Sequence, residues 1–228
     1  MCETYVVRAD EPFPLERLWP FTERLERYGI ASFGWGAAWV GPAGAIETYR
    51  DVRAFREDAT GRERVGAVTT IAALVHLRRP SRLSTIGLAD TQPFLDRAGR
   101  FAFSHNGDFR RHRAWRERYR AAGRIHGRAD SEVGLRWLED EWGRGEPPLV
   151  LGALHDELGG QANVMVLAAD GTPYAYAGNE ENPIFRFRLD GLDLASTGIY
   201  SIDRSLFRFV APAATERSRV RTRSVVAL

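Results

Sequence analysis

The sequence predicts an α+β domain whose strands and helices pack in layers. Segments with strand character open the chain and fill its last third, whereas segments with helical spacing gather in separate blocks. No linker, repeat or low-complexity stretch divides the 228 residues, so we expect a single domain, residues 1–228. A chain of this length can bury a substantial core without covalent cross-links.

The first part of the chain alternates between strand and helix patterns. Cys2–Arg8 is a strand-like run, and Leu15–Arg27 has apolar residues at helical spacing with an interruption at Pro20. Trp35–Val40 and Ala45–Arg50 are predicted to form a hairpin, because glycine and proline occupy the stretch between them.

The middle of the chain contains two further strands and then three helices. Thr69–Leu77 is almost continuously apolar, which is typical of a buried strand, and Arg100–Ser104 alternates in polarity. Helices are expected at Phe109–Arg120, Ser131–Trp142 and Leu149–Leu158.

The last third reads as short strands separated by glycine and aspartate. These strands are expected at Ala162–Ala168, Thr172–Ala177, Ile184–Leu189, Leu192–Ser196 and Phe207–Val210. The arginine-rich tail from Thr215 is expected to fray, as chain ends often do.

The composition excludes several functional classes. The 32 basic and 30 acidic residues nearly cancel, so no basic surface indicates a nucleic-acid partner. All basic residues are arginine, which excludes chemistry that needs a lysine amine, such as a Schiff base. No signal peptide and no apolar stretch of membrane-spanning length is visible, so we expect a cytoplasmic protein without a membrane partner.

Cys2 is the only cysteine, which excludes an intramolecular disulfide and a cysteine metal cluster. Removal of Met1 would give Cys2 a free α-amine with a pKa of about 7.7–8.0, close to the thiol value of about 8.5. The amine can then accept the thiol proton, so one residue supplies both nucleophile and base. Alone, Cys2 is more typical of a small residue in a start sequence.

Asn106 and Gly107 are candidates for stabilising an oxyanion. They follow the predicted strand Arg100–Ser104, and an asparagine amide with a glycine backbone N–H supplies two donors for a tetrahedral intermediate. Glycine also tolerates the positive φ that would turn its N–H toward a site. The alternative is a plain turn at the strand end.

Two charged positions suit the ends of an amino acid. Arg78 ends the buried strand, where a guanidinium can bind a carboxylate through two hydrogen bonds, or it belongs to a solvated turn with Arg79 and Arg82. The neighbouring His76 is interpreted as a core histidine with satisfied hydrogen bonds. Asp130 is a natural N-cap for the following helix, and its carboxylate can also bind an α-ammonium group.

In their order along the chain, these residues resemble the class II glutamine amidotransferases, which are N-terminal nucleophile hydrolases with a cysteine nucleophile. The resemblance is carried by Met1-Cys2, Gly34-Trp35-Gly36, His76-Leu77-Arg78, Thr91-Gln92-Pro93-Phe94, Ser104-His105-Asn106-Gly107 and Asp130-Ser131-Glu132. Compact, free-standing bacterial members are the most similar. The family usually has a different loop after the arginine, so Arg79 or Arg82 can replace Arg78 as the carboxylate clamp.

The resemblance implies a four-layer αββα sandwich with the nucleophile at the start of a central strand. It implies catalysis by Cys2 with its own α-amine as base, an oxyanion hole from Asn106 and Gly107, and substrate binding by Arg78 and Asp130. A γ-glutamyl thioester would form on Cys2, without a metal or an organic cofactor.

Three functions remain open on the sequence. One is a glutaminase that passes ammonia to a separate synthetase subunit. Another is a stand-alone amidohydrolase that cleaves a γ-glutamyl amide in a small metabolite, as the resembling enzyme of ergothioneine biosynthesis does. The third is a catalytically inactive module that binds a ligand or a protein, against which the intact Cys2, Asn106, Gly107 and Asp130 argue.

Overall fold

The computed structural model describes residues 2–199, 205 and 207–228 of the chain. Within them, two antiparallel sheets have the strand orders β11-β9-β10-β1-β4-β2-β3 and β12-β8-β7-β6-β5. The strands are β1 (Glu3–Pro14), β2 (Trp35–Val40), β3 (Ile46–Asp51), β4 (Thr69–Leu77), β5 (Phe94–Leu95), β6 (Phe101–Asp108), β7 (Gln161–Ala168), β8 (Pro173–Ala177), β9 (Ile184–Leu189), β10 (Leu192–Thr197), β11 (Thr215–Arg219) and β12 (Ser224–Ala227).

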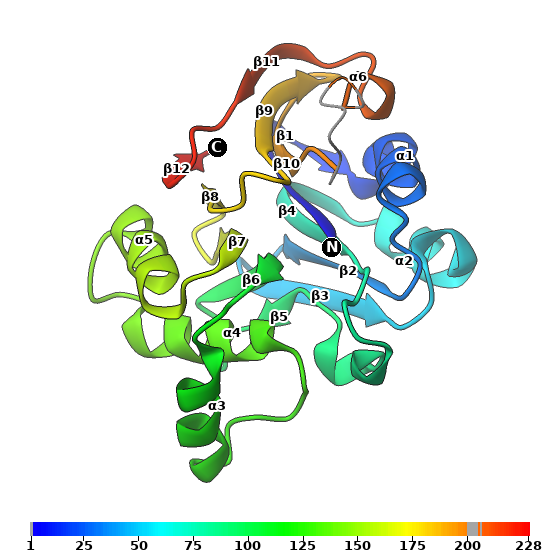
Figure 1. Ribbon diagram of the computed structural model, residues 1–228. Coiled ribbons are helices and arrows are strands. Elements are labelled where there is room, and N and C mark those ends of the chain that lie inside the picture. Colours follow the sequence, from blue (N-terminus) through cyan, green and yellow to red (C-terminus); the bar gives the residue numbers. More distant parts are fainter. Residues whose placement is uncertain (1, 200–204, 206) are drawn as a thin grey trace.

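The helices lie outside the two sheets (Figure 1). They are α1 (Trp19–Gly29), α2 (Ala59–Gly66), α3 (His112–Ala121), α4 (Asp130–Glu141), α5 (Pro147–Leu158) and α6 (Phe207–Val210). Short 3₁₀ turns cover Leu15–Leu18, Phe55–Glu57, Leu83–Thr85 and Leu88–Asp90. Among the described residues, no helix is both long and apolar enough to cross a membrane.

Three apolar clusters define four layers. Val6 and Leu74 of the first sheet meet Met165 of the second in the cluster between the sheets. The outer face of the first sheet packs against α1 through residues such as Leu25, and the outer face of the second packs against α4 through residues such as Leu138. The predicted α+β class and the αββα sandwich are therefore confirmed.

Strand β1 lies at the centre of the first sheet, between β4 and β10. Successive side chains of a strand face opposite sides, so Tyr5 and Val7 point to the helices while Val6 points to the second sheet. All three are fully buried. This packing fixes the position of Cys2, which directly precedes the strand.

The predicted elements are largely present with shifted ends. β4 has the predicted bounds, and the predicted hairpin forms between β2 and β3. Pro20 does not interrupt α1, because it lies in the first turn of the helix, where no backbone N–H is needed. β6 is longer than predicted and includes Asn106 and Gly107.

Two predictions for the end of the chain are wrong. Phe207–Val210 is a helix, not a strand: Phe207 and Val210, three residues apart, are buried on one helical face, while Phe209 is 62% exposed. The tail from Thr215 does not fray. It forms β11 along β9 and β12 along β8, because the edges of both sheets offer free backbone hydrogen-bonding groups.

Candidate active site around Cys2

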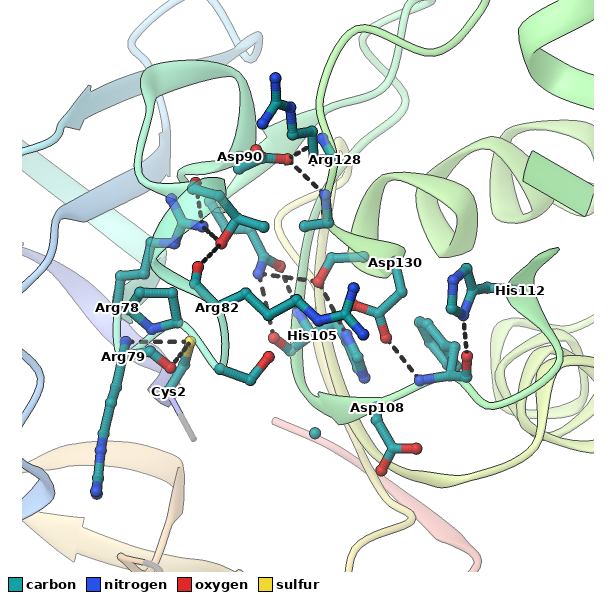
Figure 2. Close-up of a pocket in the computed structure, with 18 of the residues that line it drawn as sticks. Cys2, Arg78, Arg79, Arg82, Asp90, His105, Asp108, His112, Arg128 and Asp130 are labelled. Atoms are coloured by element: carbon teal, nitrogen blue, oxygen red, sulfur yellow. Dashed lines mark hydrogen bonds between the residues drawn. The ribbon is translucent and has the colours of Figure 1, made fainter. Parts of the chain in front are cut away.

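A pocket of about 300 Å³ opens beside the start of β1. Four of the five predicted site residues line it, namely Cys2, Arg78, Gly107 and Asp130. They come from the start of β1, the end of β4, the end of β6 and the start of α4, and Figure 2 shows three of them around the same space. The volume is at the small end of the range of ligand pockets, about 300–1,000 Å³.

The Cys2 thiol is half-buried and is held by the backbone of Arg79. Its Sγ accepts a hydrogen bond from the Arg79 N–H at 3.3 Å and lies 3.6 Å from the Arg79 carbonyl oxygen. Loss of water around the thiol raises its pKa, and the Arg79 N–H and the Arg78 charge oppose this shift. The thiol therefore needs a base to become a nucleophile near neutral pH.

Asn106 contacts the backbone of Cys2 and is fully buried. Its Nδ2 donates a hydrogen bond to the backbone carbonyl of Cys2. Its Oδ1 accepts one from Nδ2 of Asn163 at 3.2 Å, across the β6–β7 pair. Asn163 cannot be turned around, because its own Oδ1 accepts the N–H groups of Gly178 and Asn179 at 3.1 Å each. The Asn106 amide is thereby fixed with its NH₂ toward Cys2.

Gly107 adopts a backbone conformation that only glycine fits. Its φ is +127°, and a Cβ atom at this position would lie 1.7 Å from the backbone oxygen of Gln161. The Asn106-Gly107 pair belongs to β6, so the alternative of a plain turn at the strand end is wrong. The positive φ expected at Gly107 is observed.

Arg78 is a buried cation, 3% exposed, at the base of the pocket. Its guanidinium donates to the backbone oxygen of Thr85 at 2.6 Å, to the Thr85 hydroxyl at 2.9 Å and to the Gly87 oxygen at 3.3 Å. Within the described part of the chain, no carboxylate lies within ion-pair distance of it. Burial lowers its pKa, as expected for a cation that has lost much of its water.

Asp130 is the first residue of α4, and the N-cap position belongs to Ala129, so the predicted capping role is wrong. Its Oδ2 instead accepts the backbone N–H of Phe109 at 2.7 Å, which ties the helix start to the end of β6. No arginine among the described residues pairs with this carboxylate. The half-buried Asp130 thus faces the pocket with an oxygen free for a cationic group.

Gln92 connects the end of β6 to α4, a role that the sequence did not reveal. Its Oε1 accepts the His105 N–H at 2.6 Å, and its Nε2 donates to the His105 carbonyl at 3.2 Å and to the Ser131 hydroxyl at 3.3 Å. The only sequence signal was its place in the segment Thr91-Gln92-Pro93-Phe94.

Asp90 also went unpredicted: its Oδ1 accepts the backbone N–H groups of Arg128 and Ala129 at 2.7 Å each and holds the chain that leads into α4.

Two buried histidines stand next to this framework. His76 is fully buried as expected, but its hydrogen bonds are not satisfied, because Nδ1 has no partner within the described residues. Burial, with the charge of Arg78, lowers its pKa to about 3. His105 stacks on Phe109, and burial also lowers its pKa. Both rings are therefore uncharged near neutral pH.

A second hydrogen-bond chain holds the strand that carries the nucleophile. The buried Glu3 carboxylate accepts from the Thr197 hydroxyl at 2.5 Å and from the Asn182 amide at 3.4 Å. The Asn182 carbonyl in turn accepts from Nδ2 of Asn163 at 2.7 Å. Asn163 is therefore connected to the Cys2 carbonyl through Asn106 and to the Glu3 carboxylate through Asn182.

No protein-family model matches the chain, and no curated protein matches its sequence. Solved structures do match its fold. Glutamine phosphoribosylpyrophosphate amidotransferase from B. subtilis, complexed with ADP and GMP, has a TM-score of 0.71 at 12% identity. An allosteric regulatory enzyme of purine biosynthesis has a TM-score of 0.73 at 13% identity. Both cover 100% of this chain, which spans about half of their length (49% and 48%).

A glutamine aminotransferase class-II domain protein from Silicibacter pomeroyi matches over 100% of this chain and 98% of its own, with a TM-score of 0.63 and 17% identity. At such identities the likeness establishes the fold. That fold is the one the sequence resemblance implied.

Proposed function

We propose that the protein hydrolyses the γ-carboxamide of glutamine or of a γ-glutamyl compound, with Cys2 as the nucleophile. The observation that carries this proposal is that two opposite charges, neither of them ion-paired within the described residues, lie around one thiol. Among the described residues, a buried arginine without a carboxylate at ion-pair distance and an aspartate without an ion-pair partner line the same small pocket as Cys2. An α-amino acid carries the complementary carboxylate and ammonium groups, so Arg78 and Asp130 suit its two ends.

The reaction begins once Met1 has been removed, so that Cys2 has a free α-amine. The amine takes the thiol proton as Sγ attacks the γ-carbonyl carbon, and the C=O electrons move onto oxygen. Asn106 Nδ2 and the Gly107 N–H are the proposed donors to this oxyanion. Its collapse breaks the C–N bond, and the leaving nitrogen takes the proton from the α-ammonium.

A water molecule then attacks the thioester and gives a proton to the α-amine. The second tetrahedral intermediate expels the thiolate, which recovers that proton, and the γ-carboxylate product leaves. The raised pKa of the Cys2 thiol is consistent with this scheme, since the thiol waits protonated until the amine acts. None of these steps needs a metal or a cofactor.

Arg78 is the favoured carboxylate clamp among the three arginines considered. It is the buried one, whereas Arg79 is half-buried and Arg82 is exposed. Figure 2 shows the Arg79 side chain pointing away from the pocket residues. A carboxylate binds more strongly to a desolvated guanidinium than to an exposed one, because water screens the charge of the exposed group.

The test compares wild type with Cys2→Ala and Cys2→Ser on glutamine and on γ-glutamyl peptides. We expect turnover that requires the thiol, a measured mass without Met1, and covalent labelling of Cys2 by a glutamine-like diazoketone. Wild type and Cys2→Ala with equal activity on every substrate, or active protein that retains Met1, would overturn the proposed mechanism.

An ammonia-donating subunit is the alternative within the same chemistry. In this alternative, the ammonia released at Cys2 passes to a separate synthetase subunit. Strong glutaminase activity of the isolated protein, increased by an added synthetase, would favour it.

A further inference from the structure

The side chain of Gln92 takes the place of a backbone partner for β6. The short strand β5 pairs with β6 at Phe94 and Phe103 and does not reach His105. Two residues before Phe94, the Gln92 amide bonds both backbone groups of His105: Oε1 accepts its N–H at 2.6 Å, and Nε2 donates to its carbonyl at 3.2 Å. A neighbouring strand would supply the same donor and acceptor. His105 is therefore held at the sheet edge by a side chain.

The same amide also bonds the start of α4. Because Oε1 accepts the His105 N–H, the other polar atom is the NH₂ group, whose Nε2 donates to the Ser131 hydroxyl at 3.3 Å. The Ser131 hydroxyl also bonds Nδ1 of the His105 ring at 3.0 Å. His76 lies on a further side of the amide, with its Nε2 3.5 Å from Gln92 Nε2. Gln92 is 3% exposed, so these bonds are shielded from water.

The two ends of this link stand next to groups that the proposed function uses. His105 comes directly before Asn106, the first of the proposed oxyanion donors, and Ser131 comes directly after Asp130, the proposed partner of the α-ammonium. Figure 2 shows His105 and Asp130 beside the same pocket. Both polar atoms of the Gln92 amide are bonded within the protein, so its contribution to the site passes through these neighbours.

We propose that Gln92 is a positioning residue that sets the distance between the oxyanion donors and Asp130. The inference rests on the proposed function and adds to it the group that aligns the two ends of the substrate. In a γ-glutamyl unit, a fixed number of bonds separates the γ-carbonyl from the α-amine. An ammonium bound at Asp130 therefore brings the carbonyl oxygen to Asn106 only if the spacing of the site matches. A misplacement of about 1 Å can cost roughly 100-fold in rate.

The other end of the same strand–helix pair offers a matched control. Arg100, at the start of β6, donates to the backbone oxygens of Glu139 at 2.8 Å and Trp142 at 3.1 Å near the end of α4, and it is ion-paired with Asp96. Neither Arg100 nor Asp96 lines the pocket. Arg100 therefore ties β6 to α4 as Gln92 does, but away from the proposed site.

The experiment compares Gln92→Met, Ser131→Ala and Arg100→Met with the unsubstituted protein. Steady-state kinetics on glutamine, or on the γ-glutamyl peptide that the unsubstituted protein hydrolyses, give kcat and KM per folded molecule. The rates of Cys2 labelling by a glutamine-like diazoketone and by iodoacetamide are measured beside them. The diazoketone depends on both ends of the site, whereas iodoacetamide depends on the thiol.

We expect Gln92→Met to lower kcat/KM about 100-fold, through a lower kcat and a higher KM together, and to slow diazoketone labelling while iodoacetamide labelling stays unchanged. Ser131→Ala removes only the α4 end of the link and changes little volume, so KM should rise roughly 3- to 10-fold, as for one neutral hydrogen bond. Arg100→Met should lower stability, because Asp96 is left buried without its cation, and should keep kcat/KM and both labelling rates.

Two results would overturn the inference. One is a folded Gln92→Met protein with unchanged kcat/KM, or one whose iodoacetamide labelling slows as much as its diazoketone labelling. The other is an equal loss of kcat/KM in Arg100→Met, which would reduce Gln92 to a tie between strand and helix. If Gln92→Met does not fold, an unchanged KM in Ser131→Ala decides against the inference. An unsubstituted protein that neither turns over a γ-glutamyl substrate nor reacts with the diazoketone contradicts the proposed function itself.

Discussion

Helix α4 has charged groups at both ends. Those toward its C-terminus are ion-paired within the protein, whereas the one at its first residue has no ion-pair partner among the described residues. In its C-terminal half, Arg136 donates to Glu139 at 2.6 Å and reaches back to Glu132 of the first turn at 3.3 Å, and Arg124 bonds Glu139 at 3.0 Å. At its first residue, Asp130 has no ion-pair partner among the described residues and faces a pocket lined by arginines.

Under the proposed function, this difference divides the charges of α4 into those that hold the fold and those kept for a ligand. Removing the partner of a buried, paired ion is strongly destabilising, because an uncompensated buried charge remains. An ion without a partner costs stability, so its retention in a pocket indicates a function. The following predictions test this division.

The largest effect is expected from Arg136→Met. The change leaves the buried Glu132 without its cation and removes one of the two arginines that pair with the buried Glu139, and breaking such a buried pair costs roughly 3–5 kcal/mol of unfolding free energy. Urea denaturation measures this loss, and activity per folded molecule should stay unchanged. Arg144→Met is the control, since it removes an exposed pair with Glu141 and should cost about 0–1 kcal/mol. Similar losses for both variants would contradict the structural role of the C-terminal half.

Asn163→Asp tests whether Asn163, a buried residue with a fully hydrogen-bonded side chain, supports catalysis by orienting Asn106. The aspartate can accept the same backbone N–H groups but no longer donates to Asn106. If Asn106 loses its orientation, kcat should fall about 100- to 1,000-fold, the range for one oxyanion donor, with KM nearly constant.

A pH profile distinguishes positioning from a general disturbance of the fold. Protonation of Asp at position 163 restores a donor, so the deficit of the variant should shrink as the pH falls. A folded Asn163→Asp protein with wild-type kcat would show that Asn163 does not orient Asn106.

Asp130→Asn should lower kcat/KM by roughly 10- to 150-fold, because a hydrogen bond to a charged group contributes about 1.5–3 kcal/mol. The loss should arise mainly through KM, and the Asn oxygen can still accept the Phe109 N–H. Asp140→Asn is the partner variant at the other end of α4, where Asp140 pairs with Arg124 at 2.7 Å. It should lower stability and leave kcat/KM intact. A reversed pattern would refute the division between the two ends.

The smallest predicted effect is a pH dependence of stability that arises from His76, next to the pocket. The pKa of His76 is about 3 in the folded protein, against about 6.5 when unfolded. Below pH 6.5 the unfolded chain binds a proton that the folded chain excludes, so stability falls by up to about 1.4 kcal/mol per pH unit. His76→Asn should flatten this slope between pH 6.5 and 5.5 in denaturation experiments. An unchanged slope would mean that His76 is not the responsible group.

Local patterns predicted much of the fold and the central residues of the site. Thr69–Leu77 was placed at its observed bounds, since only a buried strand suits such a long apolar run. Cys2, Arg78, Gly107 and Asp130 became candidates through their chemistry together with their order along the chain, which resembles that of one family, and they line one pocket.

The features that escaped prediction depend on contacts between distant segments. Asn163 matters because it lies opposite Asn106 in the β6–β7 register, 57 residues away, and no local pattern contains that pairing. Phe207–Val210 alternates in polarity like a strand, yet it becomes a helix because Phe207 stacks on Phe185. The arginine-rich tail reads as polar and loose until the free edges of two sheets are available to it.

The same tail ties the two sheets together. β11 covers one edge of the first sheet, β12 covers one edge of the second, and the backbone oxygen of Leu228 accepts a hydrogen bond from Arg8 on β1. Removal of this segment would expose β8 and β9 as bare edges, which recruit strands from other molecules. For anyone producing the protein, the C-terminus is thus a poor place to shorten the chain, and a fusion there should begin only after a flexible spacer.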